Sequence, residues 1–170
     1  NRLIAIYNNQ IVAIDLTSRA VSTLKTNSGV AGIAVQSFNG GVIDSVNNKL
    51  LISAFHTDNA LIELDLITNQ HQLLAITPAN TNAPVSGIVD IALNADGSKV
   101  YLLSQPTGVI HQLDRNSGVA QVIVNECPNA SGMNMLDTDY TTLHNIIYNP
   151  YNDSLLITAN AVLEVAGQLE

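Results

Sequence analysis

Few side chains in this sequence of 170 residues have the types that acid–base or metal chemistry needs. One group lies around two histidines: His56 is followed closely by Asp58, and His144 directly precedes Asn145. Neutral histidine with carboxylate or amide oxygens can bind a divalent metal ion or supply a general base. Because the spacing of these residues matches no metal-binding motif, the alternative is a structural or solvated role.

A second group lies in the segment 125–142, where Glu126, Asp137 and Asp139 accompany several amide oxygens. Hard oxygen ligands of this kind suit Ca²⁺, so Ca²⁺ is a candidate cofactor. The segment lacks the glycine and the terminal glutamate of an EF-hand loop, and the alternative is a solvated acidic loop. Tyr140 could instead anchor a partner or hold the loop against the rest of the protein.

No catalytic residue is assigned, because the sequence contains no nucleophile elbow, P-loop or HExxH motif. The formal net charge of -8 argues against a nucleic-acid partner. Apolar runs such as residues 88–93 are far shorter than the ~18 residues that span a bilayer, so no membrane insertion is expected. The single Cys127 excludes an internal disulfide framework.

A repeat organises the chain. One short apolar strand starts at Leu3, Leu50, Val100 and Leu155, with spacings of 47, 50 and 55 residues. A period near 50 residues indicates a propeller, a solenoid or an array.

A second strand follows each copy, and the first three of these end on Asp15, Asp65 and Asp114. A polar four-residue link and another apolar strand come next, which is the pattern of a β-hairpin. An aspartate carboxylate can accept the backbone N–H groups two or three residues further along the chain. We therefore expect these three aspartates to act in stability and not in activity.

Another hairpin precedes each later copy of the repeated strand, with an Asx turn at Asp44, Asn94 and Asn149. Each repeat thus has four antiparallel strands in chain order, a to d, in which strand a comes before the repeated apolar strand b. No segment has helical periodicity. The sequence predicts an all-β fold. The repeats cover approximately residues 1–26, 38–76, 87–124 and 143–170, with a loop insertion at 125–142.

Four short strands in ~50 residues, apolar on both faces, are what a blade of a β-propeller requires. The chain would read b-c-d, a-b-c-d, a-b-c-d, a-b-c, which is about three and a half blades in one segment. Open blade faces and sheet edges promote aggregation, so we expect other polypeptide to complete the ring. That polypeptide is the rest of a longer chain, which is the favoured reading, or a second copy.

Residues 90–103 and 109–118 resemble the bacterial YVTN-type propeller repeat, whose relatives include lactonase-like and surface-layer propellers and, more loosely, TolB-like and WD40 repeats. The resemblance implies a full ring in which seven blades are favoured, and a periplasmic or extracellular protein. Two copies depart from the pattern. Gly40 stands in the first strand a, and Ala166 ends the last strand c where the others have Asp.

Ligands of such propellers usually bind where strand a begins, and Asp90 aligns there with Asn145 and Gly40. A polar ring at this channel mouth could hold a metal ion or a polar ligand, as in lactonase-like propellers. The alternative is that Asp90 and Asn145 bind backbone N–H groups of the preceding loop. The candidates for the mouth are Asp90, Asn145, His144, His56 and Asp58.

The leading hypothesis is a non-enzymatic binding or scaffold module that contacts a protein or a glycan. Its contacts would come from the d–a and b–c loops, where the sequence varies most in length between repeats. The rival hypothesis is a lactonase-like or other hydrolytic propeller with a divalent metal ion at the central channel.

Overall fold

A computed structural model describes the chain except residues 56–59, 83, 105–108, 125–143, 159–161 and 167–170. The regular elements of the described part are strands and one short 3-10 helix, η1 (Asn27–Gly29). The strands are β1 (Arg2–Ile6), β2 (Gln10–Asp15), β3 (Val21–Thr26), β4 (Ser37–Asp44), β5 (Lys49–Phe55), β6 (Ala60–Asp65), β7 (His71–Ala75), β8 (Thr77–Pro78), β9 (Ile88–Leu93), β10 (Lys99–Ser104), β11 (Ile110–Asp114), β12 (Val119–Val124), β13 (Asn145–Asn149), β14 (Ser154–Thr158) and β15 (Val162–Ala166).

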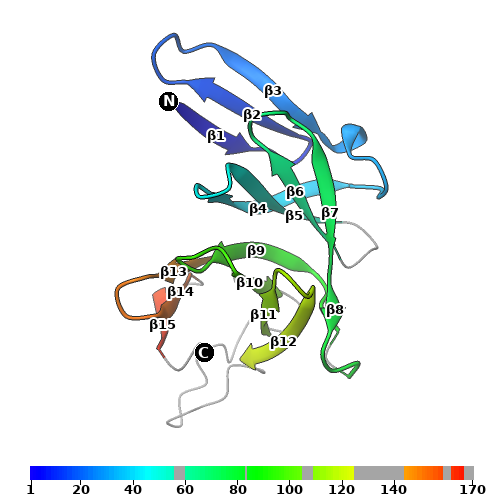
Figure 1. Cartoon of the computed structure of the whole chain (residues 1–170), viewed down its shortest axis with the longest axis vertical. Helices are drawn as coiled ribbons and strands as arrows, with labels where there is room; N and C mark the ends of the chain where they lie inside the picture. Colours follow the sequence, from blue (N-terminus) through cyan, green and yellow to red (C-terminus); the bar gives the residue numbers. More distant parts are fainter. Residues whose placement is uncertain (56–59, 83, 105–108, 125–143, 159–161, 167–170) are drawn as a thin grey trace.

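The strands form four sheets that follow one another in chain order (Figure 1). We call them blade 1 (β1–β3), blade 2 (β4–β7), blade 3 (β9–β12, with β8 at its outer edge) and blade 4 (β13–β15). Within each blade, consecutive strands pair antiparallel. The all-β class and the strand phase predicted from the sequence are confirmed.

Two details differ from the sequence prediction. The repeat pattern contains no strand between blades 2 and 3, but β8 pairs in parallel with β12 and lies along the outer edge of blade 3 (Figure 1). The first strand a, β4, has a β-bulge between Phe38 and Gly41 in its pairing with β5, which the sequence pattern did not indicate.

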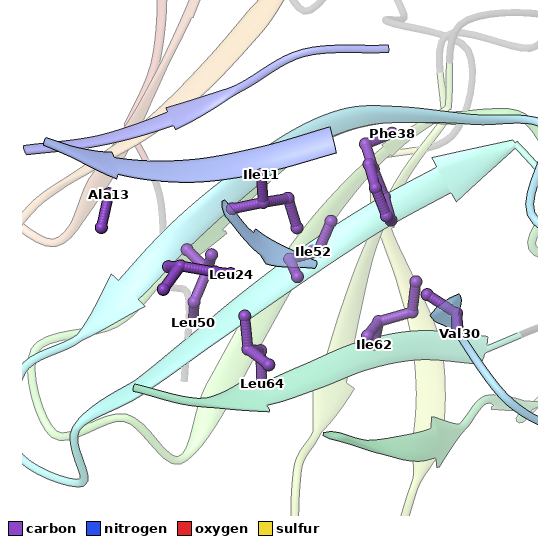
Figure 2. Packing of buried hydrophobic residues seen from close by; sticks show 9 residues of the cluster. All are labelled: Ile11, Ala13, Leu24, Val30, Phe38, Leu50, Ile52, Ile62 and Leu64. Carbon is purple, nitrogen blue, oxygen red and sulfur yellow. The ribbon is translucent and has the colours of Figure 1, made fainter. Parts of the chain in front are cut away.

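The hydrophobic core lies between the blades and forms three clusters. Blades 1 and 2 enclose the cluster of Figure 2, in which Ile11 and Leu24 of blade 1 meet Leu50 and Ile62 of blade 2. Blades 2 and 3 enclose a second cluster, and blades 3 and 4 a third. Because inner blades bury both faces, their strands are apolar at consecutive positions and do not alternate with polar residues.

The c–d turns share one local geometry. Asp15, Asp65 and Asp114 each accept the backbone N–H groups two and three residues further on, at 2.6 to 3.1 Å. The residue four positions after each aspartate has a positive φ, as at Asn69 (59°) and Gly118 (71°). These are the contacts that the turn interpretation of the three aspartates requires.

The a–b turns are less uniform. Asn94 accepts the N–H of Lys99 at 2.9 Å, and Asn149 accepts the N–H of Tyr151 at 3.1 Å. Asp44 accepts the N–H of Asn47 at 3.0 Å, but it also faces the next blade, as described below.

We expect Asp65→Ala to lower the melting temperature at pH 7 by a few degrees, because the turn loses its acceptor. The backbone N–H of Thr68, Lys49 and the N–H of Ile67 hold the pKa of Asp65 well below its usual 3.8. A carboxylate with a lowered pKa stabilises the fold above pH 3.8, and that contribution is lost as the pH falls. Thermal melts between pH 7 and pH 3 should therefore show a smaller acid-dependent loss in the variant than in the wild type.

Lys49→Met serves as the comparison, because it removes the ion pairs of Lys49 with Asp65 at 2.9 Å and with Glu63 at 3.9 Å but keeps the turn. Its effect should be the smaller one, since exposed ion pairs contribute little. Equal melting temperatures for Asp65→Ala and the wild type would contradict the structural role.

Candidate functional site

The three aligned positions at the start of strand a come together in space. Asp90 of β9 lies between Gly40 of β4 and Asn145 of β13, and it is only 8% exposed. Its Oδ2 accepts the backbone N–H of Ile146 at 3.0 Å and the side chain of Asn145 at 3.4 Å. The expected partner was the preceding loop, but the carboxylate binds the inner strand of the following blade instead.

Gly40 is at this position because it leaves room for Asp90. A Cβ atom on Gly40 would lie 2.2 Å from Oδ1 of Asp90. Ser53 satisfies the backbone of Gly40, since its Oγ accepts the N–H at 3.0 Å and donates to the C=O at 3.2 Å. A polar residue at all three positions would not fit, which explains the departure of the first repeat.

Burial raises the pKa of Asp90 above its usual value, although the hydrogen bonds from Ile146, Ile91 and Asn145 oppose that rise. A carboxyl group with a raised pKa can exchange a proton closer to neutral pH than an exposed one. In the structure the Asp90 carboxylate connects blades 3 and 4 through its hydrogen bond with Ile146. A parallel link joins blades 2 and 3, where the Asn39 side chain donates to the C=O of Ile88 at 2.9 Å.

Of the other candidates for the mouth, His144 belongs to the part of the chain that the structure describes. His144 is exposed, and its backbone N–H donates to the C=O of Thr158 at 2.9 Å. Within the residues that the structure describes, no three His, Cys, Asp or Glu side chains form a group that could hold a metal ion. The remaining candidates lie outside the described residues: His56, Asp58, Glu126, Asp137, Asp139 and Tyr140.

Two large aromatic side chains are exposed at the same end of the blades as Asp90. Tyr7, which follows β1, and Phe55, the last residue of β5, are both 52% exposed. They flank the start of β4, because the N–H of Phe38 donates to the C=O of Asn8, and Phe55 pairs with Ser37 across the sheet. The sequence analysis did not single them out, although each lies at a predicted strand end next to a b–c loop.

A cleft of about 510 Å³ lies between blades 2 and 3 at the opposite end. Arg115 is the central residue there. Its Nη1 bonds the Asp44 carboxylate and, at 3.2 Å, the C=O of Gly97, while its Nη2 and Nε bond Oε2 of Glu63 at 2.6 and 3.2 Å. The side chains of Asp44 and Glu63 are 1% and 8% exposed. Arg115 therefore neutralises two buried carboxylates of the neighbouring blade.

Electrostatics in the cleft favour the charged forms. Burial acts to raise the pKa of Asp44, but the hydrogen bonds from Arg115 and Asn47 outweigh it and hold the pKa below its usual value. Burial acts to lower the pKa of Arg115, and its two carboxylate partners outweigh that effect. Sequence reasoning missed this cluster. The available signal was Glu63, a charged residue at a position of an apolar strand that must face another blade.

Known proteins resemble this chain in fold only. No family model and no curated protein sequence matches it. Among solved structures, it matches a chain of a nidogen/laminin complex with 12% identity and a TM-score of 0.65, over 93% of this chain and 52% of the other. It matches an auxiliary nutrient binding protein from Bacteroides ovatus ATCC 8483 with 14% identity and a TM-score of 0.69, over 97% and 35%.

A third match is the glutaminyl cyclase of Myxococcus xanthus, with 14% identity and a TM-score of 0.61, over 96% and 67%. The four consecutive blades and these similarities define a β-propeller fold. The chain spans about half the length of the nidogen/laminin chain that it matches. No helix in the described part of the chain is long and apolar enough to cross a membrane.

Proposed function

We propose that the chain is a binding or scaffold module of a β-propeller protein, which contacts another protein or a glycan through its d–a and b–c loops. The observation that carries the proposal is the exposure of Tyr7 and Phe55 at the loop end of blades 1 and 2. Aromatic side chains are scarce in this sequence, at 4% of the residues, and exposed aromatic residues are enriched at binding surfaces.

The polar groups beside these rings suit a partner with hydrogen-bonding capacity. Ser37 of β4 pairs with Phe55, Asn39 follows in the same strand, and residues 27–36 add further amide groups. Aromatic and amide groups exposed together can bind a polypeptide or a sugar ring. The similarity to a nutrient binding protein and to a chain of a protein complex agrees with a binding role.

We further propose that the repeats are of the YVTN type and that the protein acts in the periplasm or outside the cell. Both proposals rest on the resemblance of residues 88–124 to that repeat.

The rival function is hydrolysis with a divalent metal ion at the channel mouth, and the buried Asp90 favours it. Calorimetric titration with Ca²⁺, Mg²⁺ and Zn²⁺ tests this reading. A stoichiometric metal site that Asp90→Asn weakens at least tenfold, together with lactone hydrolysis by the loaded protein, would support the rival and contradict the binding role.

For the binding role, we expect a glycan array and a displayed peptide library to return a ligand that the 170-residue chain retains. Tyr7→Ala and Phe55→Ala should each weaken that ligand at least tenfold, because each removes an anchor of the surface. The matched control is Tyr151→Ala, since Tyr151 is 97% exposed but lies in the a–b turn at the other end. A ligand that is lost in the control and retained in both loop variants would refute the assigned surface.

A further inference from the structure

The outward face of blade 1 carries an apolar row whose two outer members are exposed and whose middle member is half-buried. Leu3, Ile14 and Val21 are cross-strand neighbours on β1, β2 and β3. Leu3 is 53% exposed and Val21 is 65% exposed. Exposed aliphatic residues in a contiguous row mark a surface that another apolar surface covers.

The other blades show what covers this row. In blade 3 the same positions are Val100, Leu113 and Ala120, which are at most 1% exposed and pack in the cluster shared with blade 2. In blade 2 they include Leu50 and Leu64, which are equally buried against blade 1. Each of these rows is therefore covered by the opposite face of the preceding blade.

Blade 4 carries the complementary face at the other end of the array. Ile147 is 56% exposed and pairs with Leu156 across the sheet. The same positions in blade 3 are Ala92 and Tyr101, at 3% and 1% exposed, which pack in the cluster shared with blade 4. The exposed face of blade 4 therefore corresponds to the face of blade 3 that packs against the following blade.

We propose that a second copy of this chain docks head to tail, with the Ile147 face of one copy on the Leu3–Val21 row of the other. One chain carries both halves of an interface that it already forms three times internally. The nidogen/laminin chain of similar fold is about twice as long as the part that this chain matches, so two copies supply a comparable length. The inference does not depend on the binding function proposed above.

A head-to-tail contact uses two different surfaces, and such contacts form a ring or a filament depending on the rotation between copies. Each copy has a net charge of -8, so the copies repel one another at long range. Salt screens this repulsion, and we expect association to strengthen as the ionic strength rises.

Sedimentation velocity of the 170-residue chain at micromolar concentration tests the proposal, and we expect a mass that is a multiple of 18.1 kDa. Val21→Asp and Ile147→Asp should each weaken association at least tenfold. The matched controls are Val46→Asp and Ile67→Asp, whose side chains are 70% and 74% exposed in turns. Circular dichroism melts of all variants check folding, and Leu3→Lys replaces Val21→Asp if that variant does not fold.

Mixing provides the decisive observation. Val21→Asp keeps an intact blade 4 face and Ile147→Asp keeps an intact blade 1 face, so the mixture should form a one-to-one dimer although each variant alone is monomeric. The proposal would be overturned if the wild-type chain stayed a monomer at 100 μM. That concentration is roughly a hundredfold above a micromolar Kd. Association that Ile147→Asp leaves unchanged would overturn it as well, because the contact would then join two blade 1 faces.

Discussion

Replacing Arg115 by Met is expected to lower the free energy of unfolding by about 3 kcal/mol, near the lower end of the range for breaking a buried ion pair. The variant would leave the Asp44 carboxylate, at 1% exposure, without its cation, and it would leave Glu63, at 8% exposure, with only the longer ion pair of 3.9 Å to Lys49. We choose the lower end because the Arg115 side chain is itself 14% exposed and water can reach part of the cluster. Chemical denaturation at pH 7 measures the change.

Two companion variants separate the charge effect from a general effect of losing an arginine. Arg19→Met removes an exposed arginine from a c–d turn and should leave stability nearly unchanged. The combination of Arg115→Met with Asp44→Asn and Glu63→Gln should recover a large part of the loss, because no unpaired charge remains buried. If Arg115→Met unfolded at the same denaturant concentration as the wild type, the ion pairs of Arg115 would not contribute to the free energy of unfolding, and the prediction would be wrong.

Gly40→Ala is expected to cost about 1 to 3 kcal/mol of stability, the usual range for forcing an extra group into a packed site. The added methyl group would lie 2.2 Å from Oδ1 of Asp90 and 3.1 Å from its Cα, so the Asp90 side chain must leave its hydrogen bond with Ile146. Gly40 is not among the residues with a positive φ, so the cost comes from space and not from backbone strain. Thermal and chemical unfolding both report it.

The matched control is Gly29→Ala, whose added methyl group meets only the side chains of Thr26 and Lys25. A double-mutant cycle with Asp90→Ala gives a stricter test. Once Ala occupies position 40, removal of the Asp90 side chain should cost much less than in the wild type, because the collision disappears with it. Additive effects of the two substitutions would contradict the crowding between blades 2 and 3.

The strand pattern and the turns could be predicted because both depend on neighbours in sequence. Asp15, Asp65 and Asp114 bind N–H groups two and three residues away, so the amino acids of one short segment determine the geometry. The repeated strands at Leu3, Leu50, Val100 and Leu155 are visible because the same hydrogen-bonding and burial requirements return in each blade.

The candidate site could be predicted only in part. Alignment of the repeats brought Gly40, Asp90 and Asn145 together correctly, since equivalent positions of neighbouring blades are close in space. It assigned the wrong backbone partner to Asp90, because the choice between the preceding loop and the next blade depends on how two sheets approach each other. The contacts of His71 were not predicted either: its ring contacts Lys25 Nζ at 3.3 Å and the N–H of Ala31 at 3.0 Å, both in the part of the chain before blade 2.

By itself the sequence determined the all-β class, the order of the strands and the positions of the turns, because those features follow from side-chain periodicity and hydrogen bonds within a few residues. Only the tertiary structure decided the contacts between blades. Arg115 meets Glu63 from 52 positions away and Asp44 from 71, and β8 pairs with β12 across a comparable interval. Partners so far apart are selected by the angle and register at which two sheets pack, and no local pattern in the chain encodes that choice.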